Sequence, residues 1–227
     1  MIIGSGLIGS AFESSKHKFK NTCIYASGVA NSNSSDYNDF KREKDQLLFS
    51  LSKYHKLRRF YYFSSCSVYD NDQNHTPYVK HKLHMENLVI KNTNGVVIRL
   101  PQVVGKSENP HTLTNFIYSS IKNQKQFSLW KKAKRNLIDV EDVVKIIAAL
   151  DIVDINKPIL NVANVKNYKI MDIVTEFEKI IGLKGIFKTV DLGSEYDIDI
   201  ADICTLVVEI QSIFDDHYLA KLLRKYY

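Results

Sequence analysis

Residues 60–82 read FYYFSSCSVYDNDQNHTPYVKHK and predict the end of a strand followed by the start of a helix. The aromatic residues at 60–63 favour a β-strand, because bulky rings pack well on a pleated surface. Thr76 fits a helix N-cap, and Pro77 fits the first helical position, where its missing N–H costs nothing. The stretch therefore predicts a strand, a serine-containing turn and a helix over residues 76–91.

Tyr78 and Lys82 stand four residues apart in this helix, so they lie side by side on one face. The lysine ammonium favours the phenolate, which should lower the pKa of Tyr78 and make it a candidate general acid/base. Ser65 falls at the strand end, where its hydroxyl can hold a substrate oxygen. Because the chain has 13 tyrosines, a bare Y-x-x-x-K pair is expected by chance, and the surrounding motifs decide its meaning.

Length and composition fit one α/β domain with a small lobe, at 227 residues. No apolar run approaches the roughly 18–20 residues of a transmembrane helix and no signal peptide is evident, so we expect a cytoplasmic protein without a membrane partner. The three cysteines, Cys23, Cys66 and Cys204, lie far apart and indicate buried thiols, not disulfides or a metal site. His81 and His84 are expected on the helix surface.

The formal net charge is +6, and the densest basic cluster spans residues 131–135. No RNA- or DNA-binding signature is present, so we expect no nucleic-acid partner. A basic surface also suits an anionic small substrate such as a nucleotide diphosphate. We favour this interpretation because the cluster falls inside a motif described below.

Gly4, Gly6 and Gly9 form a G-x-G-x-x-G directly after a short apolar strand and before a helix. In that context the glycines allow a tight turn and let a pyrophosphate approach the helix N-terminus. The acid that usually follows about 20 residues later, to hold the adenosine ribose, is missing, since residues 27–35 contain no Asp or Glu. The glycine motif is therefore present without the acidic residue that usually accompanies it.

Strand and helix patterns alternate along the chain, which predicts a Rossmann-like, doubly wound parallel sheet of reduced strand number. Further strands are expected at residues 22–26, 96–100, 127–130 and 159–162. Further helices are expected at residues 39–54, 112–122 and 170–181, after Asp139, and through most of 202–227, with a loop at 102–110.

Read together, these segments resemble the extended short-chain dehydrogenase/reductase family, in its NAD-dependent epimerase/dehydratase branch that acts on nucleotide sugars. The resemblance covers nearly the whole chain. The matching pieces are the glycine loop at 4–9, Ala26-Ser27-Gly28, Ser64–Tyr69, Tyr78 with Lys82, Arg99-Leu100-Pro101, Val104-Gly105, Arg135–Val143, and Leu160-Asn161-Val162 followed by Tyr168-Lys169-Ile170.

The resemblance implies the following domains and sites. A cofactor domain would comprise residues 1–101 and 139–163, and a substrate lobe residues 102–138 and 164–227. The catalytic residues would be Ser65, Tyr78 and Lys82. NAD or NADP would contact Gly4, Gly6, Leu7, Ile8, Gly9, Ala26, Ser27, Gly28, Tyr78, Lys82 and Pro101. A nucleotide-diphosphate sugar would contact Ser65, Cys66, Ser67, Thr112 and Arg135, with Arg135 at the diphosphate.

The chemistry implied by the resemblance is sugar oxidation, or its reverse, within an epimerase or a ketoreductase of surface-polysaccharide biosynthesis. Tyr78 would take a hydroxyl proton while hydride passes to the nicotinamide, and Ser65 would stabilise the developing carbonyl. A dehydratase would add an acid/base pair just after the serine, and Cys66-Ser67 offers no carboxylate. The sequence does not separate epimerase from reductase or NAD from NADP, and it does not name the sugar.

The chain also departs from the family pattern. Ile3 stands where the family's loop normally has a glycine. The gap between the glycine loop and Ala26 is too short for the family's second and third strands, so we interpret residues 22–26 as the fourth strand; the competing interpretation is the second strand without its acid. Either way the adenosine half loses its usual partner. The alternative function is therefore a catalytically degenerate nucleotide-sugar binding or regulatory module.

In this family the helices before and after the central strand commonly form a four-helix dimer interface. Here these helices are residues 39–54 and 76–91, which predicts a homodimer. The candidates to line that interface, or to cover the sheet instead, are Leu47, Leu48, Leu51 and Leu83.

Overall fold

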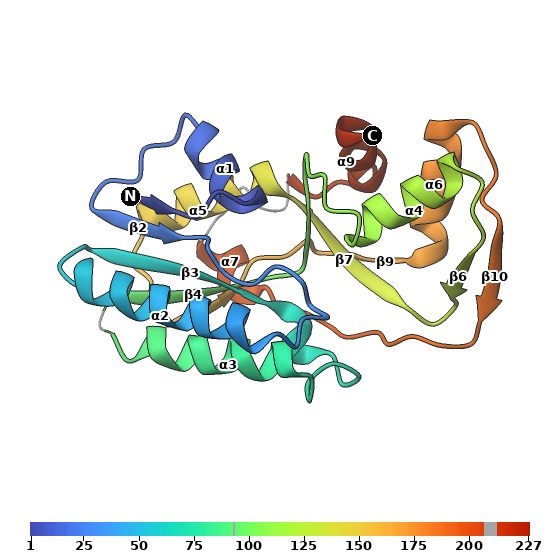
Figure 1. Cartoon of the computed structure of the whole chain (residues 1–227). Helices are drawn as coiled ribbons and strands as arrows, with labels where there is room; N and C mark the ends of the chain where they lie inside the picture. Colours follow the sequence, from blue (N-terminus) through green and yellow to red (C-terminus); the bar gives the residue numbers. More distant parts are fainter. Residues whose placement is uncertain (93, 207–212) are drawn as a thin grey trace.

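The structure is a computed structural model that describes residues 1–92, 94–206 and 213–227, and its centre is a five-stranded parallel sheet (Figure 1). The strands lie side by side in the order β1-β2-β3-β4-β8. Their bounds are β1 Ile2–Ile3, β2 Thr22–Tyr25, β3 Arg59–Ser65, β4 Gly95–Leu100 and β8 Ile159–Asn161. The predicted Rossmann-like parallel sheet is confirmed.

Helices cover both faces of this sheet (Figure 1). On one face lie α1 (Leu7–Ser14) and α5 (Val140–Asp151), and on the other lie α2 (Tyr37–Lys53) and α3 (Pro77–Ile90). Side chains alternate along β3, as they do along any strand. Tyr61 and Phe63 pack into the core under α1 and α5, whereas Phe60 and Tyr62 pack under α2 and α3. The aromatic run at residues 60–63 therefore serves both cores.

The helix that follows β3 begins as its sequence predicts. The Thr76 side chain accepts a hydrogen bond from the Val79 N–H at 3.3 Å, and Pro77 takes the first helical position. A 3₁₀ turn, η1 (Cys66–Tyr69), joins β3 to this region. The predicted helix boundaries, residues 76 and 91, are the N-cap and C-cap of α3.

Within the described residues, two smaller sheets and four more helices complete the fold. In one sheet β5 (Gln102–Val104) runs parallel to β7 (Lys134–Asp139), which pairs antiparallel with β9 (Asn167–Lys169). In the other, β6 (Phe127–Trp130) runs parallel to β10 (Phe187–Val190). The remaining helices are α4 (Leu113–Lys122), α6 (Ile170–Ile181), α7 (Ala201–Leu206) and α9 (Tyr218–Tyr226). The pair β6 and β10 lies at the end of the molecule opposite β1, next to α4 and α6 (Figure 1).

Some predictions for the second half of the chain were wrong. Residues 102–110 were expected to be a loop, but Gln102–Val104 pair with β7. The tail was expected to be mostly helical over 202–227, and α7 and α9 confirm this for its described residues; residues 207–212 lie outside them. Cys204 is only partly buried, whereas Cys23 and Cys66 are buried as expected. No helix in the described ranges has both the length and the apolar character to cross a membrane.

The connection from β1 through α1 to β2 has an unusual hand. The first four strands follow one another across the sheet in chain order, so every connection moves in the same direction. Because α1 lies on the face opposite α2 and α3, its connection must have the opposite hand to theirs (Figure 1). About 98% of such connections are right-handed, which assigns the left hand to β1–α1–β2.

A deletion explains this connection. In a complete sheet of order 3-2-1-4-5-6, the helix after the first strand leads outward to the second strand. If the second and third strands are removed together with their helices, the helix after the first strand stays on the same face of the sheet. It then leads directly to the fourth strand. The position of β2 between β1 and β3 is that of the fourth strand. The structure thus supports the interpretation of residues 22–26 as a fourth strand over the competing one.

A buried ion pair fastens α3 to β4. Arg99 donates to both carboxylate oxygens of Glu86, at 3.0 and 2.6 Å, and to the Tyr69 hydroxyl at 2.7 Å. The Ser64 hydroxyl donates to the same carboxylate at 2.5 Å. The Glu86 side chain is only 3% exposed, so its charge depends on these partners instead of water.

We expect Glu86→Ala to lower the free energy of unfolding by about 3 kcal/mol or more, because it leaves the Arg99 cation buried without its anion. Urea denaturation followed by circular dichroism measures this. The matched control is Asp191→Ala, which removes the acid of an ion pair with Lys132 whose side chains are both mostly exposed. That change should leave the free energy of unfolding almost unchanged. Equal losses in the two variants would contradict the assignment.

Candidate functional site

The predicted site residues gather at the carboxyl edge of the main sheet, where ligands bind in open α/β folds. The glycine loop follows β1, residues 26–28 follow β2, residues 65–67 end β3, and Pro101 follows β4. Tyr78 and Lys82 come from the first turns of α3. The fold therefore brings these predicted residues to one edge from five separate elements.

Two of the loop glycines are required by the protein itself. Gly4 has a φ of +115°, and a Cβ there would lie 2.3 Å from the Ala26 carbonyl oxygen. A Cβ on Gly9 would lie 2.1 Å from the Gly4 carbonyl oxygen. Both distances are far below van der Waals contact. These glycines let the loop pack tightly against the end of β2.

Gly6 is different, because nothing in the protein demands a glycine there. Its φ is −75°, and a Cβ would have no atom within 4 Å. It is the N-cap of α1, and no side chain caps the helix, so the first N–H groups, beginning at Leu7 and Ile8, point to free space. Free N–H groups beside a glycine that leaves room fit a phosphate. The loop thus suits the pyrophosphate of a dinucleotide.

Lys82 lies buried between α3, α2 and β3. Its side chain is 3% exposed, and its ammonium donates to Glu43 Oε1 at 3.1 Å and to the Tyr62 hydroxyl at 3.2 Å. The ammonium also lies 5.8 Å from the centroid of the Tyr78 ring. Gly28 leaves room for it, since a Cβ there would lie 2.5 Å from Nζ. The predicted pair and the end of β2 therefore meet in space.

Glu43 is the residue of this site that the sequence analysis missed. Its side chain is fully buried, and its carboxylate accepts hydrogen bonds from the Val29 N–H at 2.7 Å and the Tyr62 hydroxyl at 2.7 Å. Burial raises the carboxyl pKa, but Lys82 and the hydrogen bonds outweigh burial and lower it to about 2. Glu43 is therefore ionised at neutral pH. Its position four residues before the buried Leu47 was a signal that it faces inward.

His81 was predicted on the helix surface, and this was wrong. It is 9% exposed, its Nε2 lies 3.1 Å from Glu43 Oε2, and the Phe40 ring stacks on it at 4.4 Å. The buried carboxylate accounts for this, because it offers the ring a partner inside the protein. His84, in contrast, is exposed as expected.

Tyr78 and Ser65 lie on either side of the turn that ends β3. Tyr78 is 7% exposed and packs with Val29 and Val79, and its hydroxyl makes no hydrogen bond within the described part of the chain. The Ser65 hydroxyl donates to Ser67 Oγ at 3.0 Å and accepts from the Ser67 N–H at 3.1 Å. Both hydroxyls can therefore turn to a ligand at little cost. Cys66 is buried, which raises the pKa of its thiol.

Arg135 lies in β7 beside an acidic segment, residues 191–195, that the sequence analysis did not connect with it. Its guanidinium donates to the Ser194 carbonyl at 3.1 Å, and the Ser194 hydroxyl donates to Asp70 at 2.8 Å. Lys132 and Lys134, from the predicted basic cluster, pair with acids of the same segment, Asp191 and Glu195. The charge that was expected to attract an anionic substrate is thus partly neutralised within the chain.

Thr112 has a structural role. Its hydroxyl caps α4 by accepting the Asn115 N–H at 3.3 Å. Within the described ranges, no hydrogen bond joins Thr112 or Arg135 to Ser65, Tyr78 or Lys82. The hydrogen bonds of these two substrate candidates therefore run to other groups and do not join them to the catalytic candidates.

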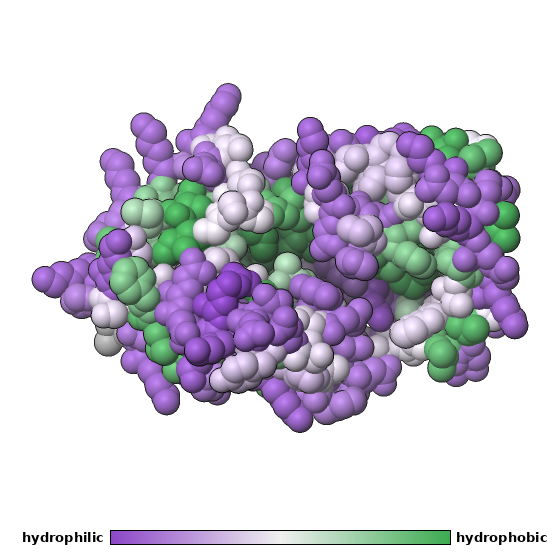
Figure 2. Space-filling view, viewed as in Figure 1, coloured by the Kyte–Doolittle hydropathy of each residue, from purple (hydrophilic) through white to green (hydrophobic). Residues whose placement is uncertain are grey.

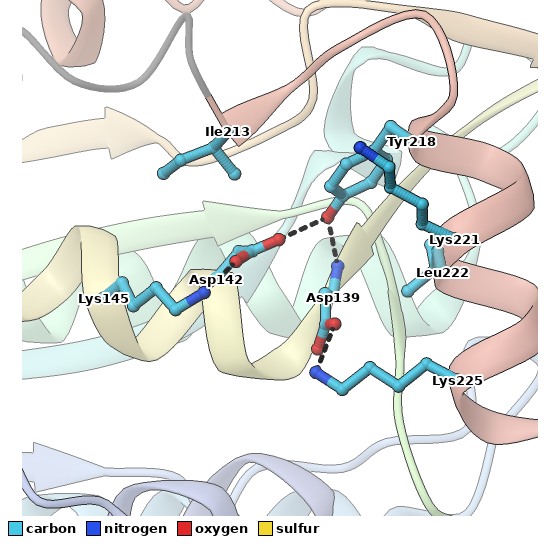
Figure 3. Close-up of a pocket in the computed structure, with 8 residues that line it drawn as sticks. All are labelled: Asp139, Asp142, Lys145, Ile213, Tyr218, Lys221, Leu222 and Lys225. Atoms are coloured by element: carbon cyan, nitrogen blue, oxygen red, sulfur yellow. Dashed lines mark hydrogen bonds and ion pairs between the residues drawn. The ribbon is translucent and has the colours of Figure 1, made fainter.

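Two cavities open near α5. One of about 720 Å³ borders the glycine loop, and its lining includes Ser5, Gly6, Leu7, Ser10, Lys16 and Lys106. The other, of about 360 Å³, lies between α5 and α9, and most of its charged groups pair with one another (Figure 3). There the Tyr218 hydroxyl donates to Asp142 at 2.8 Å, and Lys225 donates to Asp139 at 2.8 Å. Only the first cavity touches predicted site residues.

Comparison with known proteins places this geometry in context. Residues 21–163, well over half of the chain, match a family described as NAD dependent epimerase/dehydratase. No curated protein sequence matches. The matched region begins after the glycine loop, so the loop geometry and the family match are independent observations.

Several solved structures share the fold at low identity. RMD from Pseudomonas aeruginosa, solved with NADPH, superposes with a TM-score of 0.75 at 15% identity, covering 98% of this chain and 95% of that one. UDP-glucuronic acid 4-epimerase from Bacillus cereus, solved with UDP-glucuronic acid and NAD, gives 0.70 at 20% identity, covering 89% and 73%. UDP-glucose 4-epimerase from Thermotoga maritima, solved with UDP-glucose, gives 0.70 at 14%, covering 90% and 75%.

We expect Gly4→Ala to destabilise the protein by about 2 kcal/mol or more, because the new methyl group would meet the Ala26 carbonyl and φ is unfavourable. Gly6→Ala should cost less than about 1 kcal/mol, since it has space and an ordinary backbone conformation. Thermal unfolding of the two variants beside wild type measures the difference. A destabilised Gly6→Ala protein would show that Gly6, too, is structural.

Proposed function

The chain belongs to the NAD dependent epimerase/dehydratase family, and from this premise we propose that it is an NAD(P)-dependent nucleotide-sugar epimerase or ketoreductase. The observation that carries the proposal is the Tyr78–Lys82 pair, buried next to Gly28. The free N–H groups at Gly6 add support, because they offer the phosphates of a dinucleotide a place at the same edge.

In the proposed reaction Tyr78 is the general acid/base. It accepts the proton of a sugar hydroxyl, and its hydroxyl is not committed to another group within the described chain. Ser65 donates a hydrogen bond to the oxygen that becomes a carbonyl. Lys82 keeps one of its three protons for a ligand, since two are given to Glu43 and Tyr62. The bound nicotinamide supplies hydride acceptance and donation.

The residues present favour epimerisation or ketoreduction over dehydration. Dehydration needs an additional acid/base pair next to the serine, and Cys66 and Ser67 supply none. A nucleotide-diphosphate sugar of surface-polysaccharide biosynthesis is the proposed substrate, with Cys66, Ser67, Thr112 and Arg135 as its further contacts. The two-lobe division, with the cofactor bound by residues 1–101 and 139–163, and a cytoplasmic location belong to the same proposal.

A degenerate binding or regulatory module is the second candidate function. As far as the structure describes the chain, the main sheet lacks the second and third strands of the complete order, which in a Rossmann fold lie on the adenosine side. The acidic segment beside Arg135 also weakens the case for a diphosphate there. These observations favour weak cofactor binding without turnover.

We expect calorimetric titration with NAD and NADP, oxidised and reduced, to show micromolar binding of at least one. Gly6→Ala should weaken this binding about tenfold or more, because its methyl group would fill the space beside the free N–H groups. Tyr78→Phe should leave binding within about threefold but lower hydride transfer about 10²–10⁴-fold.

Titration of the same protein with UDP, GDP, CDP and dTDP separates the two candidate functions. Nucleotide binding without any cofactor binding would support the degenerate module and contradict the enzyme. Cofactor binding that Gly6→Ala leaves intact would contradict the place assigned to the phosphates.

We also propose a homodimer through α2 and α3. Leu47 and Leu51 cover the sheet and are buried, whereas Leu48, Phe49, Leu83 and Ile90 are 42%, 65%, 37% and 37% exposed. The surface of α2 visible in Figure 2 is otherwise largely hydrophilic. The exposed apolar side chains on these two helices are the natural centre of such an interface.

Light scattering at micromolar concentration should give the mass of a dimer, and the double variant Leu48→Glu/Phe49→Glu should give that of a monomer. The charge introduced at the centre of the interface would have to be buried without a partner. Ile152→Glu, at a side chain that is 84% exposed outside these helices, is the control and should remain dimeric. A monomeric wild type would remove the proposal.

A further inference from the structure

We propose that Glu43 is a positioning residue for the reaction: its buried carboxylate fixes the Lys82 ammonium and cancels its charge beside Tyr78. The inference rests on the proposed function in assigning the reaction to Tyr78. It concerns a residue that is neither in the Y-x-x-x-K pair nor in the glycine loop.

Hydrogen-bond donors surround both oxygens of the Glu43 carboxylate. One carboxylate oxygen accepts from Lys82 and Tyr62, at 3.1 and 2.7 Å, and the other from the Val29 N–H at 2.7 Å, with His81 Nε2 at 3.1 Å. The donors come from β3, from α3 and from the loop after β2. A carboxylate held from three sides has one position, and it fixes the groups that it binds.

Both members of the Glu43–Lys82 ion pair are buried. The side chains of Glu43 and Lys82 are 0% and 3% exposed, so water cannot solvate either charge. An isolated charge at such a site is strongly disfavoured, whereas the pair with its hydrogen bonds is tolerated. The charge of Lys82 therefore depends on Glu43. By fixing the ammonium, Glu43 also helps to set the direction of the third ammonium proton, which a ligand would use.

The pair also determines the net charge next to Tyr78. The sequence alone predicts a lone cation four residues away, which would favour the phenolate. The structure instead places a neutral ion pair there, since the Glu43 carboxylate is bound directly to the Lys82 ammonium. The ion pair holds Lys82 in place for proton transfer, but its net charge of zero does little to stabilise the Tyr78 phenolate. Removing the anion alone should restore that stabilisation.

Other titratable groups near the cluster have to be separated from this effect. They are Tyr25 on β2, Arg42 on α2, Tyr62 on β3, and His81 and Glu86 on α3. Burial and the Glu43 charge raise the pKa of Tyr25 and Tyr62 well above the usual range, so both stay neutral donors. An ordinary histidine titrates near neutral pH, so His81 needs its own control.

The experiment is a pH titration of Tyr78 in protein labelled with carbon-13 at the tyrosine ring, with the Tyr78 signal assigned by its loss in Tyr78→Phe. We expect the midpoint in Glu43→Gln to fall by about one pH unit, since the Lys82 ammonium, 5.8 Å from the Tyr78 ring centroid, keeps its hydrogen bond to Tyr62 and gains the amide oxygen as acceptor, but its charge is no longer compensated. Glu43→Asp keeps the charge and should stay within about 0.3 unit. His81→Gln should also stay within about 0.3 unit.

A second variant keeps the test valid if Glu43→Gln does not fold. The double variant Glu43→Gln/Lys82→Met removes both charges, and replacing a buried pair by neutral groups is often tolerated. The titration midpoint of Tyr78 in this double variant should stay within about 0.5 pH unit of wild type, because the charges of Glu43 and Lys82 already cancel in wild type. A midpoint that is unchanged in Glu43→Gln, or raised by a full unit in the double variant, would overturn the inference.

Hydride transfer separates this inference from the proposed function. UDP-glucose and UDP-glucuronic acid serve as probe substrates for NAD reduction. In Glu43→Gln the acid limb of the pH profile of kcat/KM should shift to lower pH by about one unit. In Glu43→Asp it should not shift. If wild type binds no dinucleotide in the calorimetric titration, the proposed function falls, while the Tyr78 titration still decides whether Glu43 compensates Lys82. If NAD is reduced but the limb does not move, the role of Glu43 falls alone.

Discussion

The close contact between the backbones at Gly4 and Ala26 is the constraint on which the amino-terminal half depends. Only a glycine with a positive φ can bring the loop after β1 against the end of β2. That contact holds a two-residue strand at the sheet edge and starts α1 on the face opposite α2. The left-handed connection follows, because the chain then has to reach the neighbouring strand from that face. The described part of the chain thus keeps the glycine loop of a Rossmann fold next to its first strand, without the second and third strands of the complete order.

Two buried acids fix α3, and through it the proposed acid/base. Glu86 binds Arg99 of β4, and Glu43 of α2 binds Lys82 of α3 itself, so the helix is held from both the sheet and its neighbour. Buried ion pairs add little net stability compared with apolar packing, but they penalise any arrangement that separates them. Tyr78 is thereby carried on a helix with one allowed position, which suits proton transfer, where geometry matters before pKa.

The features that sequence could predict are those decided by local chemistry. Thr76 and Pro77 set the start of α3, Gly182 ends α6 with a φ of +74°, and the glycine loop requires its turn wherever it occurs. Glu43 was missed because its meaning depends on Lys82, which is 39 residues away in sequence. The acidic segment beside Arg135 was missed for the same reason, since Ser194 is 59 residues distant. Long-range charge pairing leaves no local pattern, although the inward position of Glu43 could have been read from Leu47.

Gly6 distinguishes a loop kept for a ligand from one kept only for folding. Glycine loses more conformational freedom on folding than any other residue, so a glycine without steric need lowers stability. Gly4 and Gly9 have that need, whereas the space at Gly6 would accept a side chain, including one that caps α1. A loop that served folding alone would gain from a serine or an aspartate at this position. The retained glycine and the uncapped N–H groups make physical sense together if an anion occupies the space, and this favours a chain that still binds phosphate at its shortened half.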